Sequence, residues 1–161
     1  MYQLGARSQR NLQGVHLDLV RVVTRAIALT TQDFTVLQGL RTLAEQRDNV
    51  RKGASRTMAS RHLPGSDGAG HAVDLGAWVD GKVDWTWARY LPIADAMRQA
   101  AREFAIPIRY GGGWFELQDL DSAAAIAAAT DAYSMSRRAA GAKPFLDGGH
   151  FELPTSHAYP Q

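Results

Sequence analysis

Residues 60–76 read SRHLPGSDGAGHAVDLG and join a polar loop to the start of an alternating apolar segment. Residues 60–70 are rich in Ser, Gly, Pro and Asp, which favour turns and loops. From position 71 onward the pattern alternates in the way that is typical of a β-strand with one buried face. Val73 and Leu75 then face the core, and Asp74 points to the opposite face of the sheet. The stretch therefore predicts a strand that carries a carboxylate on its polar face.

A second segment, DGGHFEL at 147–153, has the same arrangement near the end of the sequence. His150 and Glu152 share one face of the expected strand, and apolar side chains alternate with them. If the two strands are neighbours, Asp74 and His150 lie side by side, and His62 in the preceding loop can supply a third ligand. Two imidazoles and one carboxylate form a zinc donor set that leaves one coordination position open. Spacing alone leaves ordinary core or surface histidines as the other interpretation, because the stronger HExxH signature is absent.

The remaining pattern predicts one α+β domain with a small, mostly antiparallel sheet and helices packed against it. Asn11 is the expected N-cap of the first helix. We expect a single catalytic domain over 1–161, with its core at about 4–153 and a loose tail at 154–161. The expected helices cover 12–29, 43–53, 86–106 and 121–140, and the expected strands lie in 33–39, 71–79, 107–114 and 144–154.

Composition excludes several classes of protein. The 161 residues carry a formal net charge of only +2, whereas nucleic-acid binding requires a clustered basic face. The chain has no cysteine, so disulfides, a thiolate nucleophile and Cys-type zinc modules are excluded. We find no signal-peptide pattern and no apolar run approaching the roughly 20 residues of a membrane span. We therefore expect neither nucleic-acid binding nor membrane insertion.

The segments SRHL and GHAVDL together resemble the S-x-H-x-x-G-x-A-x-D pattern of the LAS zinc peptidases, and DGGHFEL resembles their second signature. The N-terminal stretch from LGARSQ to GLRT, residues 4–42, is similar to the phage L-alanyl-D-glutamate peptidases, which are endolysins of the M15 group. The resemblance extends over roughly residues 4–153. It implies the LAS architecture, also described as D-Ala-D-Ala peptidase/hedgehog-like, and one bound Zn²⁺ ion.

Carried onto this sequence, the resemblance implies that His62, Asp74 and His150 are the zinc ligands. It implies that Asp147 is the general base, although an aspartate before two glycines is also a common turn residue. Arg41 corresponds to an arginine that stabilises the oxyanion and the substrate, which is an effective use of a fixed guanidinium.

Other residues receive supporting roles from the same resemblance. Ser60 is expected to contact substrate or to brace a ligand, and Glu152 to orient a histidine ligand. Trp114 follows a run of glycines, and a place in the substrate cleft and a place in the core both remain open. His16 and His157 are expected to have no role in the site.

The spacing of the first motif departs from the family pattern, because twelve positions separate His62 from Asp74. An insertion within 64–69 explains the difference, and its turn-forming residues indicate a surface loop that leaves the ligands in place. The rival alignment makes His71 the first ligand, but His71 lies only three positions before Asp74. We therefore favour His62. Asp67 in the inserted loop is a candidate for binding a cation or shaping substrate access.

The resemblance implies a zinc metallopeptidase that hydrolyses the L-alanyl-D-glutamate bond of peptidoglycan stem peptides for host cell lysis. We expect a monomer that stays in the host cytoplasm until a holin opens the membrane and then acts on the cell wall. D-Ala-D-Ala carboxypeptidase or dipeptidase activity is the alternative within the enzyme class. Outside that class, the alternative is a zinc-bearing cell-wall-binding module that lacks catalytic activity.

Overall fold

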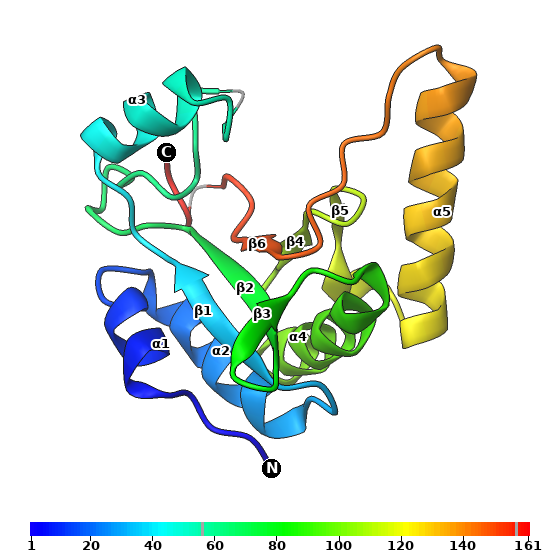
Figure 1. Ribbon diagram of the computed structural model, residues 1–161, viewed down its shortest axis with the longest axis horizontal. Helices are drawn as coiled ribbons and strands as arrows, with labels where there is room; N and C mark the ends of the chain where they lie inside the picture. Colours follow the sequence, from blue (N-terminus) through cyan, green and yellow to red (C-terminus); the bar gives the residue numbers. More distant parts are fainter. Residues whose placement is uncertain (56, 157) are drawn as a thin grey trace.

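One antiparallel sheet forms the centre of the computed structural model, which describes residues 1–55, 57–156 and 158–161 (Figure 1). The strands are β1 (Phe34–Gln38), β2 (Ala72–Val79), β3 (Lys82–Asp84), β4 (Arg109–Tyr110), β5 (Phe115–Glu116) and β6 (His150–Glu152). Their order is β1-β2-β6-β4-β5, and β3 pairs with β2 off this path. Neighbouring strands are antiparallel throughout this order, as the sequence predicted.

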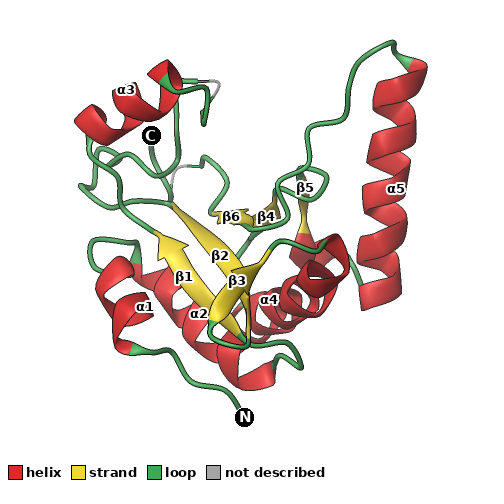
Figure 2. Ribbon diagram, viewed as in Figure 1, coloured by secondary structure: helices red, strands yellow, loops and turns green. Residues whose placement is uncertain are grey.

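The helices surround this sheet unevenly (Figure 2). They are α1 (Ala6–Asn11), α2 (Leu17–Leu29), α3 (Leu43–Arg51), α4 (Tyr90–Phe104) and α5 (Ala123–Ala139). Helices α2 and α4 pack together against the sheet, while α3 and α5 stand at opposite sides of the view. Within the described residues, none of the helices has the length and apolarity needed to cross a bilayer.

Alternation along β2 and β6 decides which face of the sheet is buried. Leu75 of β2 and Phe151 of β6 are fully buried against α2 and α4. Burying an apolar side chain of this size contributes about 1.5–3 kcal/mol. The residues next to them, Asp74 and His150, must then project from the other face. The predicted α+β class and the predicted strand faces are confirmed.

The predicted helix over 12–29 is wrong at its N-terminal end. Asn11 ends α1 instead of capping a longer helix, and its side chain donates hydrogen bonds to carbonyl groups of β1. Gly14 then turns the chain with a φ of +77°, and α2 begins at Leu17 with His16 as its N-cap. Leu12 and Val15 lie in the turn between α1 and α2 and pack into the same core as α2. Their spacing therefore matches a helical period, although the chain is not helical there.

The C-terminal tail, predicted to be loose, packs against the domain in its described residues. Tyr159 is buried, and its hydroxyl donates to Asp18 Oδ2 at 3.0 Å. Arg61 donates from its guanidinium to the carbonyl oxygens of Leu153, Tyr159 and Pro160. These long-range contacts fix the tail, and no local pattern in the sequence indicates them.

The inserted loop at 64–69 closes on itself beside the start of α2. Pro64 and Gly70 form an isolated antiparallel bridge across the base of the loop. The Gly70 N–H donates to the Gly14 carbonyl, and the His16 N–H donates to the Gly70 carbonyl, each at 2.9 Å. The insertion is thereby accommodated as a surface loop, and the chain on either side of it remains close together.

Candidate functional site

Three predicted ligands meet on the polar face of the sheet. Asp74 of β2 and His150 of β6 are direct partners in the antiparallel register. His62 reaches the same point from the loop before the insertion. Asp74 Oδ2 lies 3.2 Å from His62 Nε2, and Asp74 Oδ1 lies 3.1 Å from His150 Nδ1. One potential ligand atom from each residue lies within 4.8 Å of the others, so the group can hold one metal ion.

Hydrogen bonds at the ring nitrogens that face away from Asp74 fix the orientation of both imidazoles. His62 Nδ1 lies 2.7 Å from the Gly39 carbonyl oxygen, and His150 Nε2 lies 2.9 Å from Glu152 Oε2. These acceptors require a proton on those nitrogens, which leaves a lone pair on each ring directed at Asp74. Acceptor atoms that face one another require a cation or a proton between them. The residues present therefore fit a zinc ion.

The charge balance of the cluster leads to the same conclusion. Burial would raise the pKa of Asp74, but the charges and hydrogen bonds of His62 and His150 hold that pKa well below its usual range. Burial also opposes a charge on His150, yet its hydrogen bonds to Asp74 and Glu152 raise the pKa of His150 to about 10. Without a metal, a proton therefore occupies the position between the ring and the carboxylate at neutral pH.

Arg41 lies beside this cluster and is almost completely buried. Its Nη2 atom lies 3.6 Å from Asp74 Oδ2 and donates to Gln38 Oε1 at 2.5 Å. Its Nη1 atom donates to Gln46 Oε1 at 2.6 Å. The guanidinium is thus a fixed cation at the edge of the cluster, and it is largely shielded from solvent.

Gln46 is a supporting residue that the sequence did not reveal. It lies on α3, is fully buried, and donates through its Nε2 atom to Ser55 Oγ and the Thr57 carbonyl. It therefore connects Arg41 to the loop that follows α3. No motif marks this glutamine, and its burial is the only signal that distinguishes it.

Asp147 lines the cleft that contains the three predicted ligands, and main-chain hydrogen bonds position it. Its backbone N–H donates to the Gly111 carbonyl at 2.9 Å, and its own carbonyl accepts from the His150 N–H at 3.2 Å. A Cβ atom at Gly111 would come within 2.5 Å of the Asp147 carbonyl oxygen, so the turn requires glycine there. Burial, reinforced by the charge of Asp74, raises the pKa of Asp147. A raised pKa suits a carboxylate that accepts and returns a proton.

A cleft of about 510 Å³ contains these groups. Trp114 lines one wall, stacks on Phe145 with ring centroids 5.6 Å apart, and lies 5.6 Å from the His150 ring. Its backbone adopts a left-handed conformation with a φ of +60°, which is unusual for a bulky residue and is often found at functional sites. Trp114 therefore belongs to the cleft and not to the core.

Three other side chains complete the border of the cleft. Ser60 Oγ accepts the His62 N–H at 3.3 Å, so it braces the chain that carries this histidine. Glu152 orients His150 and also pairs with Arg109, with Nη1 and Oε1 3.1 Å apart. The Arg109 guanidinium lies 5.3 Å from the centre of the Trp114 ring. Arg109 was not identified from the sequence, because no motif includes it.

The remaining histidines do not join the cluster in the part of the chain that the structure describes. His71 is buried elsewhere and pairs with Asp67 of the inserted loop. The structure thus places His62, and not His71, beside Asp74 and His150. His157 lies outside the described residues.

Comparisons with known proteins agree with one another. A family model described as phage L-alanyl-D-glutamate peptidase matches residues 1–154. The L-alanyl-D-glutamate peptidase of Escherichia phage T5 is 32% identical over 121 residues, an alignment that covers 70% of this chain and 82% of that protein. The crystal structure of the Serratia marcescens L-Ala D-Glu endopeptidase ChiX matches with a TM-score of 0.72 and 40% identity, over 99% of this chain and 94% of that one. Sequence and fold therefore indicate the same group of proteins.

Proposed function

The chain belongs to the phage L-alanyl-D-glutamate peptidase family, and we propose that it hydrolyses this bond in peptidoglycan stem peptides with one zinc ion held by His62, Asp74 and His150. The family membership confirms the resemblance drawn from the two sequence motifs. It also accounts for the LAS-type architecture that the sequence predicted.

The observation that carries the proposal is the convergence of three potential ligand atoms at one point of the cleft. Gly39 and Glu152 hold the outer nitrogens of His62 and His150 as N–H donors, so both rings direct their other nitrogen toward Asp74, and His150 Nδ1 becomes a free ligand atom when it gives up its proton to the incoming ion. When bound, a zinc ion supplies Lewis acidity that polarises a carbonyl group and lowers the pKa of water. The chain contributes the fixed orientation of its ligands, which limits the reorganisation needed during the reaction.

Two side chains perform the remaining chemistry in this proposal. Asp147 accepts a proton from the attacking water and returns it to the leaving amine of D-glutamate. Arg41 directs its positive charge at the oxygen of the scissile carbonyl as negative charge develops there. Its position is set by Gln38 and Gln46 before substrate arrives, so no conformational change is needed to place this charge.

The cleft suits an anionic peptide. Stem peptides carry carboxylate groups, and Arg109 lies at the border of the cleft with its side chain 43% exposed. Trp114 and Phe145 offer a flat apolar surface for the methyl-bearing part of the substrate. We propose that these residues position the peptide across the metal-binding cluster.

Product analysis tests which bond is cleaved. Digestion of purified peptidoglycan should produce new N-terminal D-glutamate, because the family members are named for cleavage on its amino side. Mass spectrometry of the released muropeptides measures this directly. Released D-alanine would instead support the carboxypeptidase alternative, and the absence of any product would support the non-catalytic wall-binding module.

Zinc binding to the catalytic cluster is expected to release about one proton near neutral pH, because a ligand must lose its proton to bind a metal. The His150 pKa is raised from 6.5 to about 10, so both nitrogens of this ring are protonated before the ion binds. Zinc affinity should therefore increase as the pH rises toward that value. Calorimetric titration of chelator-treated protein in two buffers with different ionisation enthalpies measures the number of protons. A first equivalent of zinc that binds without proton release would contradict this charge balance.

We also propose the biological setting that the sequence indicated. The enzyme acts as a monomer on the bacterial cell wall during phage-induced lysis, and it reaches the wall after a holin opens the membrane. Release of cytoplasmic contents by the purified enzyme should then require prior permeabilisation of the host membrane. Lysis of intact cells by the enzyme alone would argue against dependence on a holin.

A further inference from the structure

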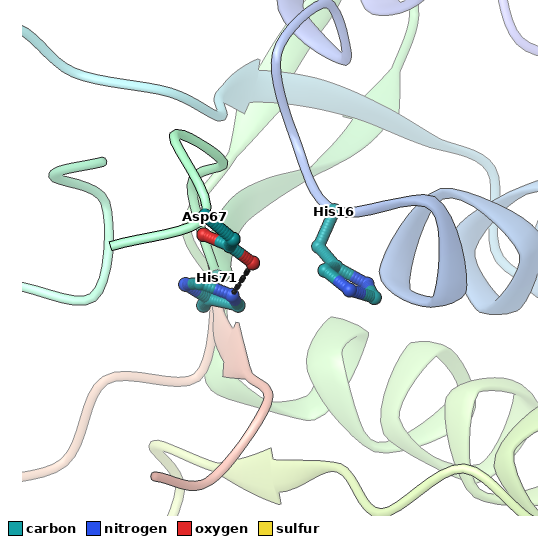
Figure 3. Close-up of side chains that lie close together, drawn as sticks. All are labelled: His16, Asp67 and His71. Carbon is teal, nitrogen blue, oxygen red and sulfur yellow. Dashed lines mark hydrogen bonds and ion pairs between the residues drawn. The ribbon is translucent and has the colours of Figure 1, made fainter. Parts of the chain in front are cut away.

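A second group of side chains that could hold a metal ion, drawn in Figure 3, includes none of the residues that line the catalytic cleft. It consists of His16, Asp67 and His71, and one potential ligand atom from each lies within 4.8 Å of the others. His16 is the N-cap of α2, Asp67 belongs to the inserted loop, and His71 immediately precedes β2. Three separate segments of the chain therefore contribute to a single point.

The three side chains face one another closely. His71 Nε2 lies 3.0 Å from Asp67 Oδ2, the contact drawn as a dashed line in Figure 3. The His16 and His71 rings are stacked with centroids 5.4 Å apart and an angle of 29° between their planes. An ion among them would require the rings to shift until one nitrogen of each, and one Asp67 oxygen, reach the roughly 2.0–2.2 Å of zinc–ligand bonds.

The local structure holds the carboxylate of Asp67 in place. Its Oδ1 atom accepts the Ala69 N–H at 3.1 Å, which leaves Oδ2 directed at His71. The Gly65 N–H donates to the Ala69 carbonyl at 2.9 Å and closes the same turn. A ligand whose position is fixed in advance loses less conformational freedom when an ion binds.

The two histidines are also fixed by the backbone. His71 is 1% exposed, and its N–H donates to the Arg61 carbonyl at 2.7 Å. His16 is held at the N-terminal end of α2 by its own N–H, which donates to the Gly70 carbonyl. Within the described residues, the Nδ1 atom of His71 is buried without a hydrogen-bond partner. His71 Nε2, the nitrogen that faces Asp67, is the ring atom available to this cluster.

We propose that His16, Asp67 and His71 bind a second zinc ion, which fastens the 64–69 loop to the start of α2. Two imidazoles with one carboxylate favour zinc and related transition metals, whereas calcium and magnesium prefer ligand sets made entirely of oxygen. This inference is independent of the function proposed for the cleft. The role of this second ion is structural, because the segment that it fastens is a surface loop.

The protonation states agree with this assignment. Burial, followed by the charge of Arg61, lowers the pKa of His71, so its ring is neutral and able to bind a metal. Burial opposes ionisation of Asp67, but hydrogen bonding to Ala69 and His71 lowers its pKa, so it is ionised. His16 Nδ1 accepts the Asp18 N–H at 3.2 Å, and binding through either nitrogen disrupts only this long capping bond. Bonds to the ion outweigh that loss.

The inserted loop also connects to the border of the catalytic cleft. The Ser66 N–H donates to the Gln161 carbonyl at 3.2 Å, and Gln161 lines the cleft. An ion at this site would therefore stabilise the packing of the C-terminal residues as well as the loop. It does not contact the catalytic cluster, so activity is not the measurement that tests it.

Metal stoichiometry of the full chain, without an affinity tag, tests the proposal. Chelator-treated protein titrated with zinc should bind two equivalents, and Asp67→Asn and His16→Gln should each reduce this to one. Substitution of both catalytic-site histidines, His62→Ala with His150→Ala, should leave one equivalent, and adding Asp67→Asn should remove it. Plasma mass spectrometry after gel filtration counts the ions, and Co²⁺ absorption spectra report the ligand geometry. Asp119→Asn, an exposed carboxylate on another part of the surface, is the matched control and should bind two.

Thermal unfolding provides an independent measurement. Zinc should raise the Tm of the variant that lacks both catalytic-site histidines, and Asp67→Asn in that background should abolish the increase. The inference is overturned if Asp67→Asn and His16→Gln each bind as many equivalents of zinc as the wild-type chain. Because the catalytic cluster is removed in one arm, failure of the second site and failure of the proposed function give different results.

Discussion

Asp147→Asn is expected to lower kcat by about 10²- to 10⁴-fold, the usual contribution of a positioned general acid–base group. The substitution preserves the size of the side chain but removes its ability to accept a proton. Asp147 is fixed through its backbone contacts with Gly111 and His150, which an amide side chain leaves intact. The zinc content and Tm of the variant should therefore match those of the wild-type chain. Steady-state hydrolysis of a synthetic L-alanyl-D-glutamyl peptide, together with metal analysis, checks both parts.

Glu152→Gln is the matched control, because Glu152 is a carboxylate in contact with His150 that, unlike Asp74, is not a proposed zinc ligand. Its proposed role is to orient that ring, and glutamine retains an oxygen that can accept the His150 N–H. Loss of such an orienting partner costs about 10- to 100-fold in metal affinity or activity. A larger loss of kcat for Glu152→Gln than for Asp147→Asn would reverse the two roles.

His62→Ala is expected to abolish binding of the catalytic ion and to lower kcat/KM by at least about 10³-fold, since Lewis-acid stabilisation is worth several kcal/mol. The substitution leaves Asp74 and His150 as an incomplete set, and it removes the ring that Gly39 orients. Zinc affinity of the first equivalent, measured by competition with a chromophoric chelator, should fall together with activity. Circular dichroism and thermal unfolding verify that the variant is folded.

His71→Asn provides the comparison that distinguishes the two alignments of the first motif. His71 faces away from Asp74, so this variant should retain the catalytic ion and most of its activity once folded. If His71→Asn loses the catalytic ion while His62→Ala retains it, the assignment of His62 is wrong. The same pair of variants separates the catalytic cluster from the second metal site.

The central part of the fold and the metal-binding cluster could be predicted because their information is local. Alternation in β2 and β6 assigned Leu75 and Phe151 to the core and Asp74 and His150 to the opposite face. The register of two antiparallel strands then placed the carboxylate beside the imidazole. The motif resemblance supplied the third residue, His62, across an insertion that the sequence marked by its turn-forming residues.

Features that depend on contacts between distant segments were not predictable in the same way. The start of α2 was placed too early, because apolar residues of the preceding turn share the core and imitate a helical period. Gln46 and Arg109 support the site through side-chain contacts that no spacing encodes. His16 and Asp67 are far apart in the sequence, and only the folding of the inserted loop against α2 brings them together.

The main-chain anchoring of Asp147 has a consequence for redesign of substrate preference. The orientation of this residue depends on backbone contacts with Gly111 and His150 and not on the wall formed by Trp114 and Phe145. The wall and the proposed proton acceptor can therefore be varied separately in directed evolution. Libraries at positions 114 and 145 can reshape the cleft for other stem peptides, whereas a side chain at position 111 would collide with the Asp147 carbonyl oxygen, so that position should be left unvaried.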